Sequence, residues 1–305
     1  MPHSSKHELA ALSKLFSPGV LRQLGASGRS AQVSRLLVLS GISHRLSSTN
    51  TLGDAFDLAF TSLKGVGNRD DYVYRAALTQ KIALGRHSLR TATVLNELRA
   101  GKSKADLVIL NGTATAYEIK SERDSLSRLE GQLADYRSVF ASTCVVTSPM
   151  QADQVLSLVP EDVGVLVLSS RFRLQILREA IDSPDRIQPL QLLSTLRVDE
   201  ALQVLELLEV EFESVPNTQR WSTLQEIFIN LDPASVHKAS VQVLKVSRSQ
   251  THMASVLQQL PATLRASVLA AKLPLKAQQN VVKAVSQPLE AVLSWSEEQR
   301  VSPVL

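Results

Sequence analysis

The sequence has 305 residues, of which 44% are hydrophobic and 20% are charged, and its formal net charge is +4 at pH 7. This composition excludes a disordered or fibrous chain and predicts a globular protein of about two domains. Aromatic residues make up only 4%, which argues against an aromatic stacking platform for single-stranded nucleic acid. The mild positive charge suits an anionic partner but does not require one.

The single cysteine and the N-terminal residues narrow the class of protein further. Cys144 lies in the apolar run Cys144–Val146, so we expect a buried thiol, no intrachain disulfide and no cysteine-based zinc site. The N-terminus lacks the apolar region of a signal peptide. No apolar run approaches the roughly 20 residues that span a bilayer. We therefore expect a cytoplasmic protein that does not enter a membrane.

The first part of the chain has the pattern of short helices. Apolar residues recur at helical spacing over residues 8–64, with breaks at Gly25–Ser30 and Ser47–Gly53. The loop Lys64–Asn68 contains a Gly-x-Gly, but no strand precedes it and a third glycine is missing, so we interpret it as a connector. A helix is expected over Tyr72–Leu84.

Strand patterns follow from residue 91. Thr91–Glu97 is rich in strand-forming residues, and Ala105–Leu110 is an apolar strand. Asn111–Gly112 is a turn sequence that predicts a hairpin with the returning strand Thr113–Lys120.

The next elements complete an α/β core. A helix is expected over residues 122–140, followed by the apolar strands Thr143–Thr147 and Val163–Leu168. This order predicts a mixed sheet flanked by helices, with helical regions on both sides of the core. After Ser170 we expect only helices. The predicted divisions are an N-terminal helical region at 1–67, a core at 68–170 and a C-terminal helical domain at 171–305.

Three residues of the hairpin strands carry candidate chemistry: Asp106, Glu118 and Lys120. Burying two carboxylates is costly unless a cation compensates them. Glu118 and Lys120 share one face of their strand, while Ile119 faces the other. We expect the carboxylates, with the backbone carbonyl of Ile119, to bind Mg²⁺ or Mn²⁺ through hard oxygen ligands. Lys120 would then orient or deprotonate an attacking water and stabilise charge on phosphorus. Its loss should abolish cleavage and leave folding intact.

The hairpin register decides whether this site can form. A two-residue turn at Asn111–Gly112 pairs Asp106 with Tyr117 and places Asp106 on the face opposite Glu118. A three-residue loop pairs Asp106 with Ala116 and brings the two carboxylates to one face. The metal site therefore requires an odd-length loop or a bulge.

The spacing of Asp106, an apolar strand, a turn and Glu118-Ile-Lys-Ser resembles the PD-(D/E)XK nuclease superfamily. The following helix carries Gln132 and Tyr136, similar to the Gln-x-x-x-Tyr of RecB-like members. Three strings resemble a poorly characterised bacterial branch of that superfamily: DDYVYR (70–75), NELRAGKSKADLVILNG (96–112) and YEIKSERDSLSRLEGQLADY (117–136). The resemblance covers about residues 68–170 and implies a restriction-endonuclease-like core.

The resemblance also implies roles for individual residues. It implies metal ligation by Asp106 and Glu118 and catalysis by Lys120. Members often add an upstream acid, for which Glu97 is the candidate, although Glu97 also suits a surface position near a turn. Here Ala105 replaces the proline that usually precedes the aspartate.

Several side chains near the motif are candidates for substrate contact. Gln132 and Tyr136 lie on the helix that follows it, although both also suit the edge of a buried helix face. Basic residues surround the motif and suit phosphate contacts, each of them also suiting a solvated surface position: Arg99, Lys102, Lys104, Arg123 and Arg128.

Two functions are compatible with the sequence. The first is a metal-dependent nuclease acting on nucleic acid, DNA above all, in a bacterial defence, repair or mobile-element setting. The alternative is a catalytically silent nuclease-fold module that binds nucleic acid, or a protein partner through its C-terminal helical domain. An edge-strand ion pair facing solvent is the structural alternative for Glu118 and Lys120.

Overall fold

The computed structural model describes residues 5–301, with side chains for residues 5–296. The chain divides into two compact units, one formed by residues 1–80 with 253–305 and the other by Lys81–His252. The region expected to be one C-terminal domain is thus divided: residues 171–252 pack with the sheet, and the remainder packs with the N-terminal helices. No helix among the described residues has the length and apolar character needed to cross a membrane.

The first unit is helical. Its N-terminal helices are α1 (Lys6–Leu15), α2 (Pro18–Ser27), α3 (Ala31–Leu39), α4 (Leu52–Leu63) and α5 (Asp71–Leu78). Its C-terminal helices are α12 (Ala254–Gln258), α13 (Arg265–Ala271), α14 (Leu275–Val285) and α15 (Leu289–Val301). Side chains that accept backbone hydrogen bonds begin all five of the first group: Ser5, Ser17, Ser30, Thr51 and Asp70. The predicted N-terminal helices and the Lys64–Asn68 connector are therefore confirmed.

Helices from the two ends of the chain pack against one another in this unit. α2 packs against α14, and α3 packs against α15. The α2–α14 approach depends on Gly25, because a Cβ there would lie 2.9 Å from the Cβ of Ala277. The N- and C-terminal segments thus share one core.

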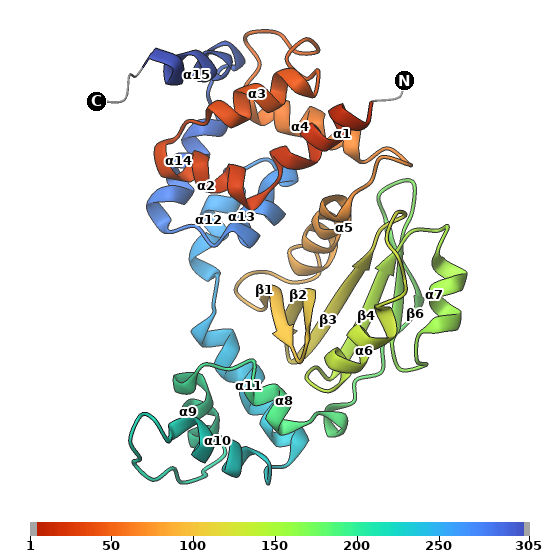
Figure 1. Ribbon diagram of the computed structural model, residues 1–305, viewed down its shortest axis with the longest axis vertical. Helices are drawn as coiled ribbons and strands as arrows, with labels where there is room; N and C mark the ends of the chain where they lie inside the picture. Colours follow the sequence, from red (N-terminus) through yellow and green to blue (C-terminus); the bar gives the residue numbers. More distant parts are fainter. Residues whose placement is uncertain (1–4, 302–305) are drawn as a thin grey trace. The chain divides into compact units, whose positions relative to one another are not determined.

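The second unit is built on a six-stranded mixed sheet whose strands lie side by side in chain order (Figure 1). β1 (Thr93–Ala100), β2 (Ser103–Asn111) and β3 (Thr113–Lys120) form an antiparallel meander. β4 (Ser142–Thr147) and β5 (Gly164–Leu168) continue the sheet in parallel with β3. The predicted mixed sheet is confirmed.

The sixth strand corrects the sequence analysis. β6 (Leu174–Arg178) pairs antiparallel with β5, so the expectation that strands end at Ser170 was wrong. β6 is an edge strand with alternately exposed residues, and it therefore lacks the continuous apolar run that marks the buried strands.

Helices cover the sheet. α6 (Leu129–Arg137) connects β3 to β4, and α7 (Ala152–Leu158) connects β4 to β5. After β6 come α8 (Pro189–Leu193), α9 (Val198–Leu207), α10 (Arg220–Phe228) and α11 (Pro233–Ser247), of which α11 contacts β2 and β3 (Figure 1). One core joins these helices to a single face of the sheet, through residues such as Val108, Ala116, Val145, Leu133 and Val243.

α6 is shorter than the helix predicted over residues 122–140. The carboxylate of Asp124 accepts hydrogen bonds from both the backbone N–H and the hydroxyl of Ser121, each at 2.7 Å. This turn holds the chain after β3 out of a helical conformation, and α6 begins only at Leu129.

Candidate active site

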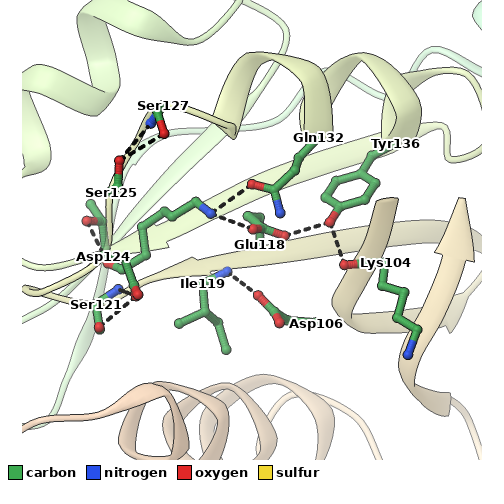
Figure 2. Close-up of polar contacts among 12 residues, drawn as sticks. Lys104, Asp106, Glu118, Ile119, Ser121, Asp124, Ser125, Ser127, Gln132 and Tyr136 are labelled. Atoms are coloured by element: carbon green, nitrogen blue, oxygen red, sulfur yellow. Dashed lines mark hydrogen bonds and ion pairs between the residues drawn. The ribbon is translucent and has the colours of Figure 1, made fainter. Parts of the chain in front are cut away.

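Glu118 and Lys120 form a buried ion pair on β3. Only 2% of Glu118 and 5% of Lys120 is exposed. The Lys120 ammonium donates to Glu118 Oε1 at 2.8 Å and to the side-chain oxygen of Gln132 on α6, also at 2.8 Å (Figure 2). The side chains therefore do not form the solvent-facing edge-strand pair that the sequence left open.

Tyr136 closes the network from α6. Its hydroxyl lies 2.7 Å from Glu118 Oε2 and 2.6 Å from the backbone carbonyl oxygen of Lys104 (Figure 2). Burial raises the pKa of Tyr136, and the negative charges of Glu118 and, less strongly, Asp106 raise it further. A phenol carries one proton, so this hydroxyl donates to only one of its two acceptors at a time.

The hairpin register differs from both alternatives considered from the sequence. Asn111 pairs with Thr113 across Gly112, whose φ of 78° places it in the left-handed region. The ladder then runs to the pair Leu107 and Tyr117. The ladder ends at this pair, one residue short of Asp106. The connection is odd in length, one residue rather than three, but the register alone does not fix the face on which Asp106 lies.

Asp106 lies where the side chains of β1 and β2 stop alternating regularly between the two faces of the sheet. Two cross-strand pairs contribute to the same α6-facing core: Leu95 with Val108 and Leu98 with Ala105. Residues three apart on a regular strand face opposite sides, so the alternation changes between these pairs. Glu97, with φ 53°, lies at this change on β1, and Asp106 lies at it on β2.

The irregularity turns the Asp106 carboxylate toward β3. Its Oδ2 accepts a hydrogen bond of 2.8 Å from the backbone N–H of Ile119 (Figure 2). The N–H and C=O of one residue in an extended strand point to the same edge, so the Ile119 carbonyl also faces β2 and Asp106. The Asp106 carboxylate thus contacts the backbone of the residue that lies between Glu118 and Lys120 in the chain.

Glu97 lies in a different environment from the two other acids. Its carboxylate is 3.5 Å from the Lys104 ammonium, and the two side chains are 60% and 58% exposed. Among the residues whose side chains are described, no group of three or more Asp, Glu, His or Cys residues is arranged to hold a metal. Glu97 is therefore a surface ion-pair partner in this conformation.

The two basic residues predicted to contact substrate are exposed. Arg128 immediately precedes α6, and Lys104 lies on β2. The sequence did not indicate Thr147 and Gln151, which secure the strand end: the Thr147 hydroxyl donates to the Lys120 carbonyl, and Gln151 donates to the carbonyl of Asp124. No local pattern marks these two residues, because their partners lie about 27 positions away in the chain.

The donor set suits a hard divalent cation. Asp106, Glu118 and the Ile119 carbonyl would supply two carboxylates and one carbonyl oxygen, and Mg²⁺ commonly combines one or two carboxylates with several waters. If Glu118 turned to a cation, each of its two hydrogen-bond donors would keep another acceptor. Tyr136 retains the carbonyl of Lys104 as an acceptor, and Lys120 retains Gln132.

The comparisons with known proteins identify a family. Residues 66–270 match the family described as Bacteriophage P4 protein cII. Protein cII of Enterobacteria phage P4 is 42% identical over 84 residues, which is 27% of this chain and 32% of that protein. A solved structure of a protein of unknown function from Silicibacter pomeroyi covers 46% of this chain and 92% of its own, at 18% identity and a TM-score of 0.30. Since the family match extends over more than half of the sequence, this chain belongs to the bacteriophage P4 protein cII family.

Proposed function

We propose that the Lys81–His252 unit is a metal-dependent nuclease that hydrolyses phosphodiester bonds in DNA, with a PD-(D/E)XK-type core. The buried Glu118–Lys120 pair beside Asp106 carries this proposal. A buried ion pair is often no more stabilising than apolar residues of the same size, so stability alone gives little reason for one here. Within this unit, three antiparallel strands are followed by a helix and a parallel strand, the order that the sequence resemblance to that superfamily implies.

Each residue has a role that its position supports. Asp106 and Glu118 bind Mg²⁺ or Mn²⁺, with the Ile119 carbonyl as a third oxygen. The bound cation supplies an acidified water and polarises the phosphodiester. Lys120 has three N–H donors, and its contacts with Glu118 and Gln132 use two of them. The third N–H orients the water or donates to a phosphoryl oxygen.

Glu118 has competing partners in the absence of a cation. Lys120 holds Oε1 and the Tyr136 hydroxyl approaches Oε2. If Glu118 ligated a cation, Lys120 would lose Glu118 as an acceptor and keep Gln132. Lys120 would then be available to donate to substrate, which would couple metal binding to activation of the lysine.

The surroundings suit a nucleic-acid substrate. Exposed basic residues lie on the β1–β2 hairpin and before α6, and they supply phosphate contacts that neither read sequence nor enter the chemistry: Arg99, Lys102, Lys104, Arg123 and Arg128. The named relative is a bacteriophage protein, which supports a mobile-element setting and action inside the bacterial cell.

Cleavage by the purified full chain tests this proposal. Plasmid, linear DNA and RNA are incubated with Mg²⁺, Mn²⁺ or EDTA, using wild type, Asp106→Asn and Glu118→Gln. Asp153→Asn is the matched control, because Asp153 is an exposed acid on α7 outside the site. We expect metal-dependent cleavage of DNA by wild type and the control, and none by the other two.

The same experiment addresses the alternative function. Wild-type protein that binds nucleic acid but cuts none of the three substrates with either metal would be a catalytically silent module. Cleavage that persists in both Asp106→Asn and Glu118→Gln would show that the active site lies elsewhere.

A further inference from the structure

A basic cavity of about 280 Å³ lies within the second unit, away from the candidate active site. We call it the basic pocket. Its lining contains three cationic and three apolar residues: Lys81, Arg86, Arg173, Ile82, Leu166 and Leu174. No acidic residue lines it. The cavity approaches the lower end of the range of small-molecule sites, roughly 300 Å³.

Two tight turns position its cations. Arg86 follows the π-helical turn Thr79–Ala83, and its backbone N–H donates to the carbonyl of Ile82 at 3.1 Å. Arg173 ends the β5–β6 turn, where its N–H donates to the Ser169 hydroxyl at 3.2 Å and its carbonyl accepts from the Ser169 N–H at 2.9 Å.

Lys81 is oriented by an aromatic ring. Its ammonium lies 5.9 Å from the ring centroid of Phe172, a cation–π distance. Phe172 has φ 57°, a left-handed conformation that is rare for an aromatic residue. The β5–β6 turn therefore supplies both Arg173 and the ring that holds Lys81.

The basic pocket opens on the sheet face opposite Glu118 and Lys120. Val165 belongs to the α6-facing core, so its neighbour Leu166, in the pocket floor, faces the other side.

The lining indicates the chemistry of a ligand. Arginine side chains present planar donor arrays that match phosphate oxygens, and lysine adds a point charge. Three exposed cations line the pocket without a lining carboxylate, and an anion with more than one negative charge would offset their like charges. Ile82, Leu166 and Leu174 form an apolar floor, two of them buried, which suits a sugar or a base rather than a bare inorganic ion.

We propose that the basic pocket binds the phosphate of a nucleotide through Lys81, Arg86 and Arg173, with the nucleoside over the apolar floor. The phosphate comes either from a free nucleotide or from a nucleotide within a strand. The site does not depend on the proposed nuclease activity, because it shares no residue with Asp106, Glu118 or Lys120.

Calorimetry in EDTA tests this binding with metal-dependent cleavage suppressed. The probes are 5′-AMP, adenosine and a single-stranded oligothymidylate of eight nucleotides, each titrated into a solution of the full chain. The test variants are Arg86→Gln and Arg173→Gln. Arg90→Gln and Arg171→Gln are matched controls, because both are exposed arginines close in sequence to the pocket but outside its lining.

We expect 5′-AMP to bind at least about tenfold more tightly than adenosine, and each test variant to lose about tenfold in affinity, the effect of one charge-assisted hydrogen bond. The controls should bind as wild type does. Binding of the oligonucleotide but not of 5′-AMP, with the same variant pattern, identifies a strand as the source of the phosphate. Equal binding of adenosine and 5′-AMP, no binding of any probe, or equal losses in the controls would overturn the proposal. Failure here with intact metal-dependent cleavage would leave the nuclease proposal standing, and the reverse result would leave the basic pocket standing.

Discussion

Replacing Lys120 with methionine tests the buried pair most directly. The sequence alone predicts that loss of this lysine leaves folding intact, since it assigns Lys120 only to water and substrate. The structure predicts the opposite, because Glu118 and Lys120 are 2% and 5% exposed and 2.8 Å apart. Removing one partner of a buried ion pair leaves an uncompensated charge and costs about 3–5 kcal/mol. We expect Lys120→Met to lose that much stability without metal.

The double variant separates the charge from the packing. Glu118→Gln with Lys120→Met removes both charges, and replacing a buried pair by uncharged residues is often neutral or stabilising by ~1–4 kcal/mol. The double variant should therefore regain most of the stability that Lys120→Met loses. The two residues are in contact, so their effects are not additive, and the double-mutant cycle measures their coupling.

Urea unfolding in EDTA, followed by circular dichroism, measures all four proteins of this cycle. When Mg²⁺ replaces EDTA, Lys120→Met should be stabilised more than wild type. The cation replaces the missing charge, and a ligand of the native state stabilises it by mass action. A loss below about 1 kcal/mol in Lys120→Met, the value typical of exposed pairs, would refute the assignment of a buried, charge-compensated pair.

Three further changes give distinct outcomes. Asp106→Asn should remove most of the rise in melting temperature that Mg²⁺ causes in wild type, which differential scanning fluorimetry measures. Tyr136→Phe should cost about 1–3 kcal/mol in urea unfolding, because it leaves a buried hydrogen-bond acceptor unsatisfied. Burial works against ionised Glu200, but hydrogen bonds from Arg248 and neighbouring donors lower its pKa from 4.5 to about 2. The stability that Glu200 contributes is therefore complete above pH 4.5 and lost as the pH falls towards 2, and Glu200→Gln should flatten this part of the acid unfolding curve.

Local pattern was sufficient for most of the fold. Buried strands such as β4 and β5 are continuous apolar runs, and the N-terminal helices combine periodic apolar residues with capping side chains. Local pattern did not predict β6, because its pairing with β5, and not its own composition, makes it a strand. The shortened start of α6 was missed because the Ser121–Asp124 turn competes locally with the helix.

The candidate site required long-range information. Sequence spacing correctly places Glu118 and Lys120 on one face, since alternation along a strand is geometric. It does not give the register of the β2–β3 hairpin, which here is tighter than either alternative. It also does not give the carboxylate of Asp106 turned onto the Ile119 N–H, because that contact depends on where two paired strands lose their alternation together.

In the proposed metal site, the polar network around Glu118 would have a role both without and with a cation. Without metal, the ammonium of Lys120 compensates the carboxylate, and the Tyr136 hydroxyl satisfies its second oxygen. Each of these donors has a second acceptor within 2.8 Å, Gln132 for the lysine and the Lys104 carbonyl for the tyrosine. If a cation took Glu118, the lysine and the tyrosine would each keep one hydrogen-bond acceptor. In the proposed reaction the lysine would then be released from Glu118 to act on the phosphate, so the residues of the buried pair would have both a structural and a chemical role.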